Sequence, residues 1–143
     1  METWQRQLLD DARSGTLGTI AATGLPQLVP VCFALVAGDI AIAIDEKPKQ
    51  GGPLARLRNI ERDPRVALLV DHYEDRWERL AWVRLEGDAL VVASGGAWPA
   101  ALAALRARYP QYRAMALERL PVIRIQPKRV VGWRAQGGAR APA

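Results

Sequence analysis

Three strand-like segments follow one another near the start of the chain, and the connections between them are too short for anything but hairpins. Residues 16–23 (TLGTIAAT) and 26–36 (PQLVPVCFALV) meet in a tight Thr-Gly-Leu-Pro turn, and Ala37-Gly38 leads into residues 40–44 (IAIAI). Parallel neighbours would need a crossover of about a dozen residues or more, so these segments predict antiparallel pairing. This excludes a doubly wound nucleotide-binding fold.

Later segments extend the same pattern. Strands are predicted at residues 65–71 (RVALLVD) and 80–93 (LAWVRLEGDALVVA). Residues 122–125 and 128–134 are predicted to form the last strand or a bent pair around Gln126-Pro127. In residues 80–93, apolar and charged residues alternate, which is typical of a strand with one buried side, and Gly87 indicates a bulge.

Short helices complete the pattern. One is predicted to begin with Thr3 as its cap and to end at Gly15, a second to open at Pro53, and a third to run from about Trp98 to Pro110. Mostly hairpin-linked strands with helices at their ends predict a mainly β (α+β) fold, a small closed antiparallel barrel, as a single domain over residues 1–135. Residues 136–143 are predicted to form a disordered tail.

The stretch over residues 39–59 carries the best indication of a ligand site. Its strand IAIAI places isoleucines on one side and alanines on the other, so both faces are dry and the alanine face can accept a close neighbour. Lys47 and Lys49 follow, two glycines come next, and Pro53 opens a helix that carries Arg56. Cations, backbone N–H groups and a helix N-terminus favour a phosphate or carboxylate. The alternative is a solvated basic loop that joins a strand to a surface helix.

Composition narrows the class of protein. With 143 residues and 50% hydrophobic content, the chain suits one domain with a real core. The N-terminal residues contain no apolar segment and no run approaches the roughly 18 apolar residues of a membrane span, so a soluble, cytoplasmic protein is expected. The net charge is +5, and residues 46–65 hold six basic and three acidic residues, or +3 of it. A basic chain can bind nucleic acid, but no helix-turn-helix, zinc spacing or RNP-like strand is found, so neither a nucleic acid nor a membrane is expected as a partner.

The residue types needed for metal or nucleophilic catalysis are scarce. His72 is the only histidine, so no histidine metal cluster can form within one chain, and no metal site is predicted. Ser14 and Ser94 lie in no nucleophile elbow, and the glycines fit neither a dinucleotide nor a triphosphate loop. The single cysteine, Cys32, is expected to pack as a small hydrophobe. Any chemistry is therefore expected to come from a bound cofactor.

Other residues suggest where such a cofactor could lie. Pro30 cannot donate to a strand ladder, so it marks an edge or a bulge where a ligand could contact the backbone of Val31 and Cys32. Trp77 in a polar loop and Trp82 in the following strand could stack on a flat heterocycle, although they could equally fill a barrel end or a subunit contact.

Two long runs of the sequence resemble one known group of proteins. The segment KPKQGGPLARLRNIERDPRVALLVDHYEDRWERLAWVRLEGDA and the terminal VIRIQPKRVVGW look like the split-barrel flavin and deazaflavin oxidoreductases related to pyridoxamine 5′-phosphate oxidase. The likeness is closest to the actinobacterial branch of F-420-dependent enzymes and extends from about Leu8 to Trp133. The flavin-phosphate pattern of the pyridoxamine phosphate oxidases themselves is missing, so their activity is not transferred.

The resemblance implies a six- to seven-stranded antiparallel split β-barrel, the FMN-binding split barrel, which forms a homodimer with the cofactor at the subunit interface. In such proteins basic residues after the third strand hold the cofactor phosphate, and residues of the second strand lie against its ring. Carried over, the cofactor-binding residues are Pro30, Val31, Cys32, Phe33, Lys47, Lys49, Gln50, Arg56, Trp77 and Trp82. Arg13 is expected to lie on the first helix, outside this groove.

The function implied by the resemblance is transfer of a hydride from reduced F-420, an 8-hydroxy-5-deazaflavin, to an electron-poor organic acceptor. No side chain is assigned as a catalytic acid, and His72 and Tyr73 are candidates for proton delivery. The alternatives are an oxidoreductase that binds FMN and a non-catalytic carrier or sensor of deazaflavin or flavin. The sequence does not indicate the acceptor.

Overall fold

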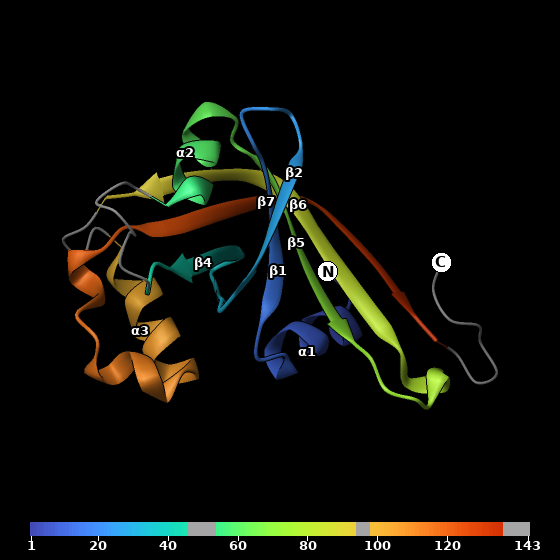
Figure 1. Cartoon of the computed structure of the whole chain (residues 1–143). Coiled ribbons are helices and arrows are strands. Elements are labelled where there is room, and N and C mark those ends of the chain that lie inside the picture. Colours follow the sequence, from blue (N-terminus) through green and yellow to red (C-terminus); the bar gives the residue numbers. More distant parts are fainter. Residues whose placement is uncertain (46–53, 94–97, 136–143) are drawn as a thin grey trace.

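The computed structural model describes residues 1–45, 54–93 and 98–135 (Figure 1). Within them, seven strands form one antiparallel sheet in the order β2-β1-β5-β6-β7-β4-β3. The strands are β1 (Gly15–Ile20), β2 (Pro26–Val31), β3 (Ala34–Val36), β4 (Asp39–Ala43), β5 (Arg65–His72), β6 (Ala81–Val92) and β7 (Val122–Arg134). The helices are α1 (Thr3–Asp11), α2 (Ala55–Arg62) and α3 (Pro99–Arg108), with short 3₁₀ turns η2 (Trp77–Arg79), η3 (Pro110–Ala114) and η4 (Leu117–Arg119). None of the described helices is long and apolar enough to cross a lipid bilayer.

The mainly β, antiparallel fold is confirmed, and its centre is the long ladder between β6 and β7. This ladder extends from Ala81 opposite Arg134 to Val92 opposite Val122. β5 pairs with the first part of β6, whereas β4 pairs with the first four residues of β7, so the two neighbours attach at opposite ends of the ladder. Figure 1 shows β1 and β2 crossing the ladder, with β5 running beside β6.

The predicted bulge at Gly87 is confirmed. The register of the β6–β7 ladder shifts between Glu86 and Gly87. A Cβ atom at Gly87 would lie 2.1 Å from the carbonyl oxygen of Gln126, which no side chain can tolerate. Only glycine can therefore occupy this position of the bulge.

The predicted single strand over residues 26–36 is wrong, because the structure divides it into β2 and β3. β2 pairs with β1 and β3 pairs with β4, which places the two strands at opposite edges of the sheet. Between them, the buried Tyr109 hydroxyl accepts a hydrogen bond from the Phe33 N–H (3.1 Å) and lies 3.1 Å from the Phe33 carbonyl oxygen. A side chain from a distant segment thus replaces the ladder bonds of Phe33, and no local pattern could have signalled this. The prediction that Pro30 marks a sheet edge is confirmed.

Several predicted helix and strand limits also differ. The N-cap of α1 is Glu2 rather than Thr3, and the Glu2 N–H donates to the buried Gln5 side chain at 2.9 Å. Gly15 does not end α1 but begins β1, which stops at Ile20 because Ala21 donates to Leu25 across the turn. The predicted helix start at Pro53 lies outside the described residues.

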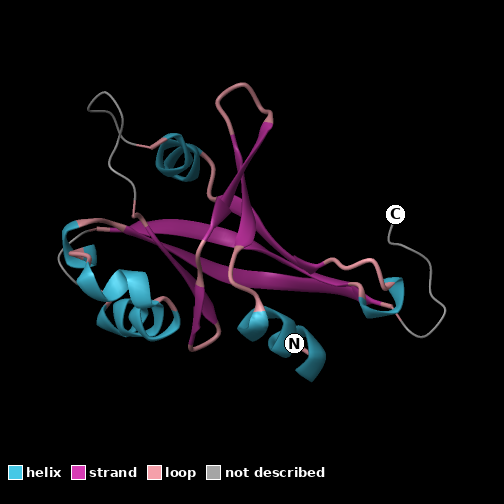
Figure 2. Cartoon of the chain, turned by 60° about the horizontal axis from the view of Figure 1, so that its bottom comes forward, coloured by secondary structure: helices cyan, strands magenta, loops and turns pink. Residues whose placement is uncertain are grey.

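The predicted two-faced character of the IAIAI strand is confirmed. Ile40, Ile42 and Ile44 belong to the buried cluster inside the barrel. Ala41 and Ala43 belong to a second cluster with Leu102 and Leu105 of α3. Because alanine is short, α3 can lie close beneath β4 (Figure 1), and Figure 2 shows the helices arranged around the outside of the crossing strands.

Replacing Tyr109 with Phe should destabilise the fold. The change leaves the Phe33 N–H without its partner in a buried position, which costs about 1–3 kcal/mol. Urea denaturation would measure the loss in the free energy of unfolding. Tyr73→Phe is the matched control, because Tyr73 is 65% exposed and its hydroxyl deletion should change the stability by less than about 0.5 kcal/mol. Equal stability of the two variants would contradict this account of the break between β2 and β3.

Candidate functional site

Two adjoining cavities open where β2 ends, β4 ends and α3 passes into η3. The first, here called the smaller chamber, has a volume of about 240 Å³ and is lined by Ser14, Pro30, Val31, Cys32, Ala43, Asp45 and Arg56. The second, the larger chamber, has a volume of about 420 Å³ and is lined by Arg13, Cys32, Asp45, Tyr109, Gln111, Tyr112 and Met115. Because Cys32 and Asp45 line both, the two chambers are neighbouring parts of one site.

Four of the residues predicted to bind a cofactor meet at the smaller chamber. Pro30, Val31 and Cys32 come from the edge strand β2 and the residue after it, and Arg56 comes from the first turn of α2. Phe33 follows directly, but its side chain is fully buried in the barrel core, where the Arg108 guanidinium lies 4.9 Å from the ring centroid. The structure therefore places the Phe33 ring in the core rather than in a chamber.

Lys47, Lys49 and Gln50 lie outside the described residues. The residues that bracket this segment are informative, because Asp45 before it and Arg56 after it both line the smaller chamber. The described residues on both sides of the segment therefore lie at the same chamber.

The aromatic residues predicted to stack on the cofactor lie away from the two chambers, as do the two candidates for proton delivery. Trp82, His72 and Tyr73 line a separate hollow of about 380 Å³, and Trp77 is 47% exposed on η2. In Figure 1, η2 follows the end of β5 that is remote from α2. His72 lies 2.5 Å from Glu74, and this hydrogen bond lowers the pKa of the Glu74 carboxyl. Within one chain, none of these residues lines either chamber.

The prediction that Arg13 lies on the first helix, outside the groove, is wrong. α1 ends at Asp11, and Arg13 lines the larger chamber. Its guanidinium donates from Nη2 to the Arg108 carbonyl oxygen at 2.7 Å and lies 4.8 Å from the centroid of the Tyr109 ring. These contacts hold a positive charge at the chamber.

Tyr112 lines the larger chamber and is hydrogen-bonded to Asp45, which lines both chambers. Its hydroxyl donates to Asp45 Oδ2 at 2.6 Å. Burial of the phenol, and then this hydrogen bond, raise the pKa of Tyr112 above its ordinary value, so the phenol remains a donor. Sequence reasoning missed Tyr109, Tyr112 and Met115 as site residues, because they lie far along the chain from Cys32 and only the packing of α3 against β4 brings them near it. It missed Arg13 because a helix was expected to continue to Gly15.

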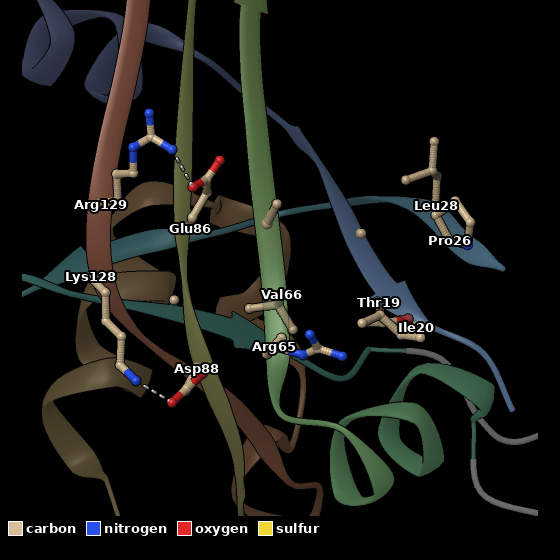
Figure 3. Close-up of a pocket in the computed structure, with 13 residues that line it drawn as sticks. Thr19, Ile20, Pro26, Leu28, Arg65, Val66, Glu86, Asp88, Lys128 and Arg129 are labelled. Atoms are coloured by element: carbon tan, nitrogen blue, oxygen red, sulfur yellow. Dashed lines mark hydrogen bonds and ion pairs between the residues drawn. The ribbon is translucent and has the colours of Figure 1, made fainter. Parts of the chain in front are cut away.

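A further hollow of about 650 Å³ lies on the outward face of the sheet, and Figure 3 shows its lining. The floor of this hollow has few side-chain atoms, because its lining includes Gly18, Ala67 and Gly87. Leu28 at its margin is 67% exposed. The charged residues around it pair with one another: Lys128 with Asp88 at 2.6 Å and Arg129 with Glu86 at 3.6 Å (Figure 3). The lining of this hollow is more apolar than that of the chambers around Cys32.

Comparison with known proteins agrees with the fold. A family model described as pyridoxamine 5′-phosphate oxidase matches residues 1–134. A curated relative from Streptomyces rimosus, 5a,11a-dehydrotetracycline/5a,11a-dehydrooxytetracycline reductase, is 31% identical over 124 residues, which are 86% of this chain and 75% of the relative. A solved conserved hypothetical protein from Mycobacterium tuberculosis has a TM-score of 0.75 at 26% identity, covering 94% of this chain and 85% of that one.

A solved F-420 reductase has a TM-score of 0.66 at 20% identity and covers 92% of this chain and 98% of its own, so it shares the fold. The family model covers nearly the whole chain, including every described strand. With its antiparallel split-barrel sheet, the chain belongs to the pyridoxamine 5′-phosphate oxidase family.

Proposed function

We propose that this chain is an F-420-dependent oxidoreductase that reduces an electron-poor organic acceptor. The observation that carries the proposal is the smaller chamber, where the edge-strand residues Pro30 to Cys32, the cation of Arg56 and both ends of the lysine-bearing segment meet. The similarity to a dehydrotetracycline reductase and to an F-420 reductase supports an oxidoreductase of flavin- or F-420-related type.

The residues of the smaller chamber fit such a cofactor. β2 is an edge strand in which Pro30 lacks a backbone N–H, and the chamber lining includes the small Ala43, so the chamber offers a surface on which part of a flat ring can lie. Arg56 supplies a cation for the anionic tail. When bound, reduced F-420 supplies a hydride. The chain's own residues would orient the ring, hold the tail and exclude water from the ring face.

The charge of the basic segment favours F-420 over FMN. FMN has a comparable ring and a single phosphate, for which Arg56 alone would be sufficient. F-420 carries a phosphodiester and glutamate carboxylates, and Lys47 and Lys49 add two cations to Arg56 for this longer tail. A non-catalytic carrier of the same cofactor would use these same residues.

Replacing either Lys47 or Lys49 with Ala should weaken binding of F-420. A charge-assisted hydrogen bond is worth about 1.5–3 kcal/mol, so the dissociation constant should rise roughly ten- to a hundredfold. Titration followed by deazaflavin fluorescence would measure it, and raising the salt concentration should weaken wild-type binding as well.

Arg6→Ala is the matched control for these variants, because Arg6 is exposed on α1 and pairs with Asp10. It removes one positive charge without touching either chamber, so the affinity should stay close to that of the wild type. Wild-type affinity in both lysine variants would show that the basic segment is only a solvated connection.

We also propose a homodimer in which a second copy covers the outward face of β2, β1, β5 and β6 around the hollow of Figure 3. Leu28 is 67% exposed there and Leu69 is 38% exposed, and the low lining at Gly18 and Ala67 leaves room for side chains of a partner. The paired charges around the hollow leave little unbalanced charge to oppose such a contact. A dimer would also allow Trp77 and Trp82 of one copy to approach the chambers of the other.

Light scattering should give a dimer of the 15.7 kDa chain at micromolar concentration. Leu69→Asp places a carboxylate in the proposed contact and should shift the protein toward the monomer. Gln7→Asp is the control, because Gln7 is exposed on α1 and lines none of the described hollows. A monomeric wild type would remove the shared-site arrangement.

A further inference from the structure

We infer that the larger chamber is the acceptor subsite and that it takes a flat conjugated ketone or quinone whose carbonyl oxygen lies on the Arg13 guanidinium. This inference rests on the function proposed above. The position of the chamber supports it, because Cys32 and Asp45 line both chambers and a molecule in the larger one lies beside whatever occupies the smaller one.

The walls of the larger chamber suit a flat, weakly polar molecule. The rings of Tyr109 and Tyr112 lie with their centroids 5.4 Å apart and their planes tilted by 59°, and the Met115 side chain adds a polarisable surface. Among the described lining residues there is one cation, Arg13, and one carboxylate, Asp45. One charge of each sign leaves this lining close to neutral, which suits an uncharged acceptor with a polar carbonyl group.

Arg13 is held ready to receive an oxygen. Its Nη2 donates to the Arg108 carbonyl oxygen and its guanidinium carbon lies 4.8 Å from the centroid of the Tyr109 ring, so two contacts hold this exposed side chain at the chamber. A cation that is already oriented stabilises a developing negative charge without reorganisation during the reaction. The Asp45 carboxylate is hydrogen-bonded to the Tyr112 hydroxyl, and none of the described ion pairs joins it to Arg13.

The chemistry of the acceptor explains why a cation is needed. A hydride that adds to the β-carbon of a conjugated ketone forms a C–H bond, and the electron pair of the C=C bond moves to the carbonyl oxygen as an enolate. The acceptor gains two electrons from the reduced deazaflavin, which becomes oxidised, and a proton from water then completes the product. Arg13 would stabilise the enolate oxygen.

Steady-state kinetics with reduced F-420 and 1,4-naphthoquinone provide the first test. Arg13→Gln should lower kcat/KM by about ten- to a hundredfold, with Arg13→Lys retaining part of the activity, while the affinity for F-420 itself changes less than about twofold. Arg6→Gln is the matched control and should behave as the wild type, because the Arg6 side chain is exposed and pairs with Asp10.

Cys32 provides a second readout that needs no cofactor, because it is the only cysteine and lines both chambers. The probe is 2-hydroxy-1,4-naphthoquinone, a flat, ionised molecule that resembles the enolate. It should slow labelling of Cys32 by a thiol reagent in the wild-type protein, with the labelled fraction measured by mass spectrometry, and it should protect Arg13→Gln at least tenfold less well.

The outcomes separate this inference from the proposed function. If Arg13→Gln keeps wild-type kcat/KM, or if the probe protects both proteins equally or neither, the acceptor subsite is wrong even though F-420 binds. If F-420 does not bind the wild type, the proposed function fails, and Arg13-dependent protection of Cys32 then decides whether the chamber still binds the conjugated molecule.

Discussion

The buried hydrogen bonds between the Tyr109 hydroxyl and the backbone of Phe33 determine how the chain crosses from one sheet edge to the other. A continuous strand over this region would have kept residues 26–36 on one side of the sheet. Instead β2 ends at Val31 and β3 begins at Ala34 beside β4. Both chambers open at this break, and Cys32 lies in it. The site therefore exists because the strand is interrupted.

Tyr109 can reach Phe33 because α3 packs closely on the alanine side of β4. Ala41 and Ala43 contribute little bulk, so Leu102 and Leu105 of α3 pack against them. At the end of α3, the Arg108 guanidinium donates to the carbonyl oxygens of Leu9, Asp10 and Ala12, which caps the C-terminus of α1. These contacts hold the chain just before Arg13, whose own guanidinium donates to the Arg108 carbonyl oxygen. The geometry of the larger chamber thus follows from the packing of one helix.

The sequence predicted those features that depend on local pattern. Antiparallel pairing followed from hairpin lengths, the bulge followed from Gly87, and the two dry faces of β4 followed from the alternation of isoleucine and alanine. The break at Phe33 could not be predicted, because Tyr109 lies 76 residues further along the chain. The role of Arg13 was missed for a similar reason. A helix was expected to continue to Gly15, and only the structure shows that it ends at Asp11 and turns Arg13 toward Tyr109.

The central claim is that the edge-strand residues, Arg56 and the lysine-bearing segment together form a deazaflavin site. Titration of the purified protein with F-420 and, separately, with FMN tests it most directly, with cofactor fluorescence as the signal. The account predicts that the protein purifies without a bound chromophore and binds F-420 more tightly than FMN, because F-420 carries more negative charge in its tail. A protein that purifies with the absorbance of FMN, or that binds FMN more tightly than F-420, would contradict it.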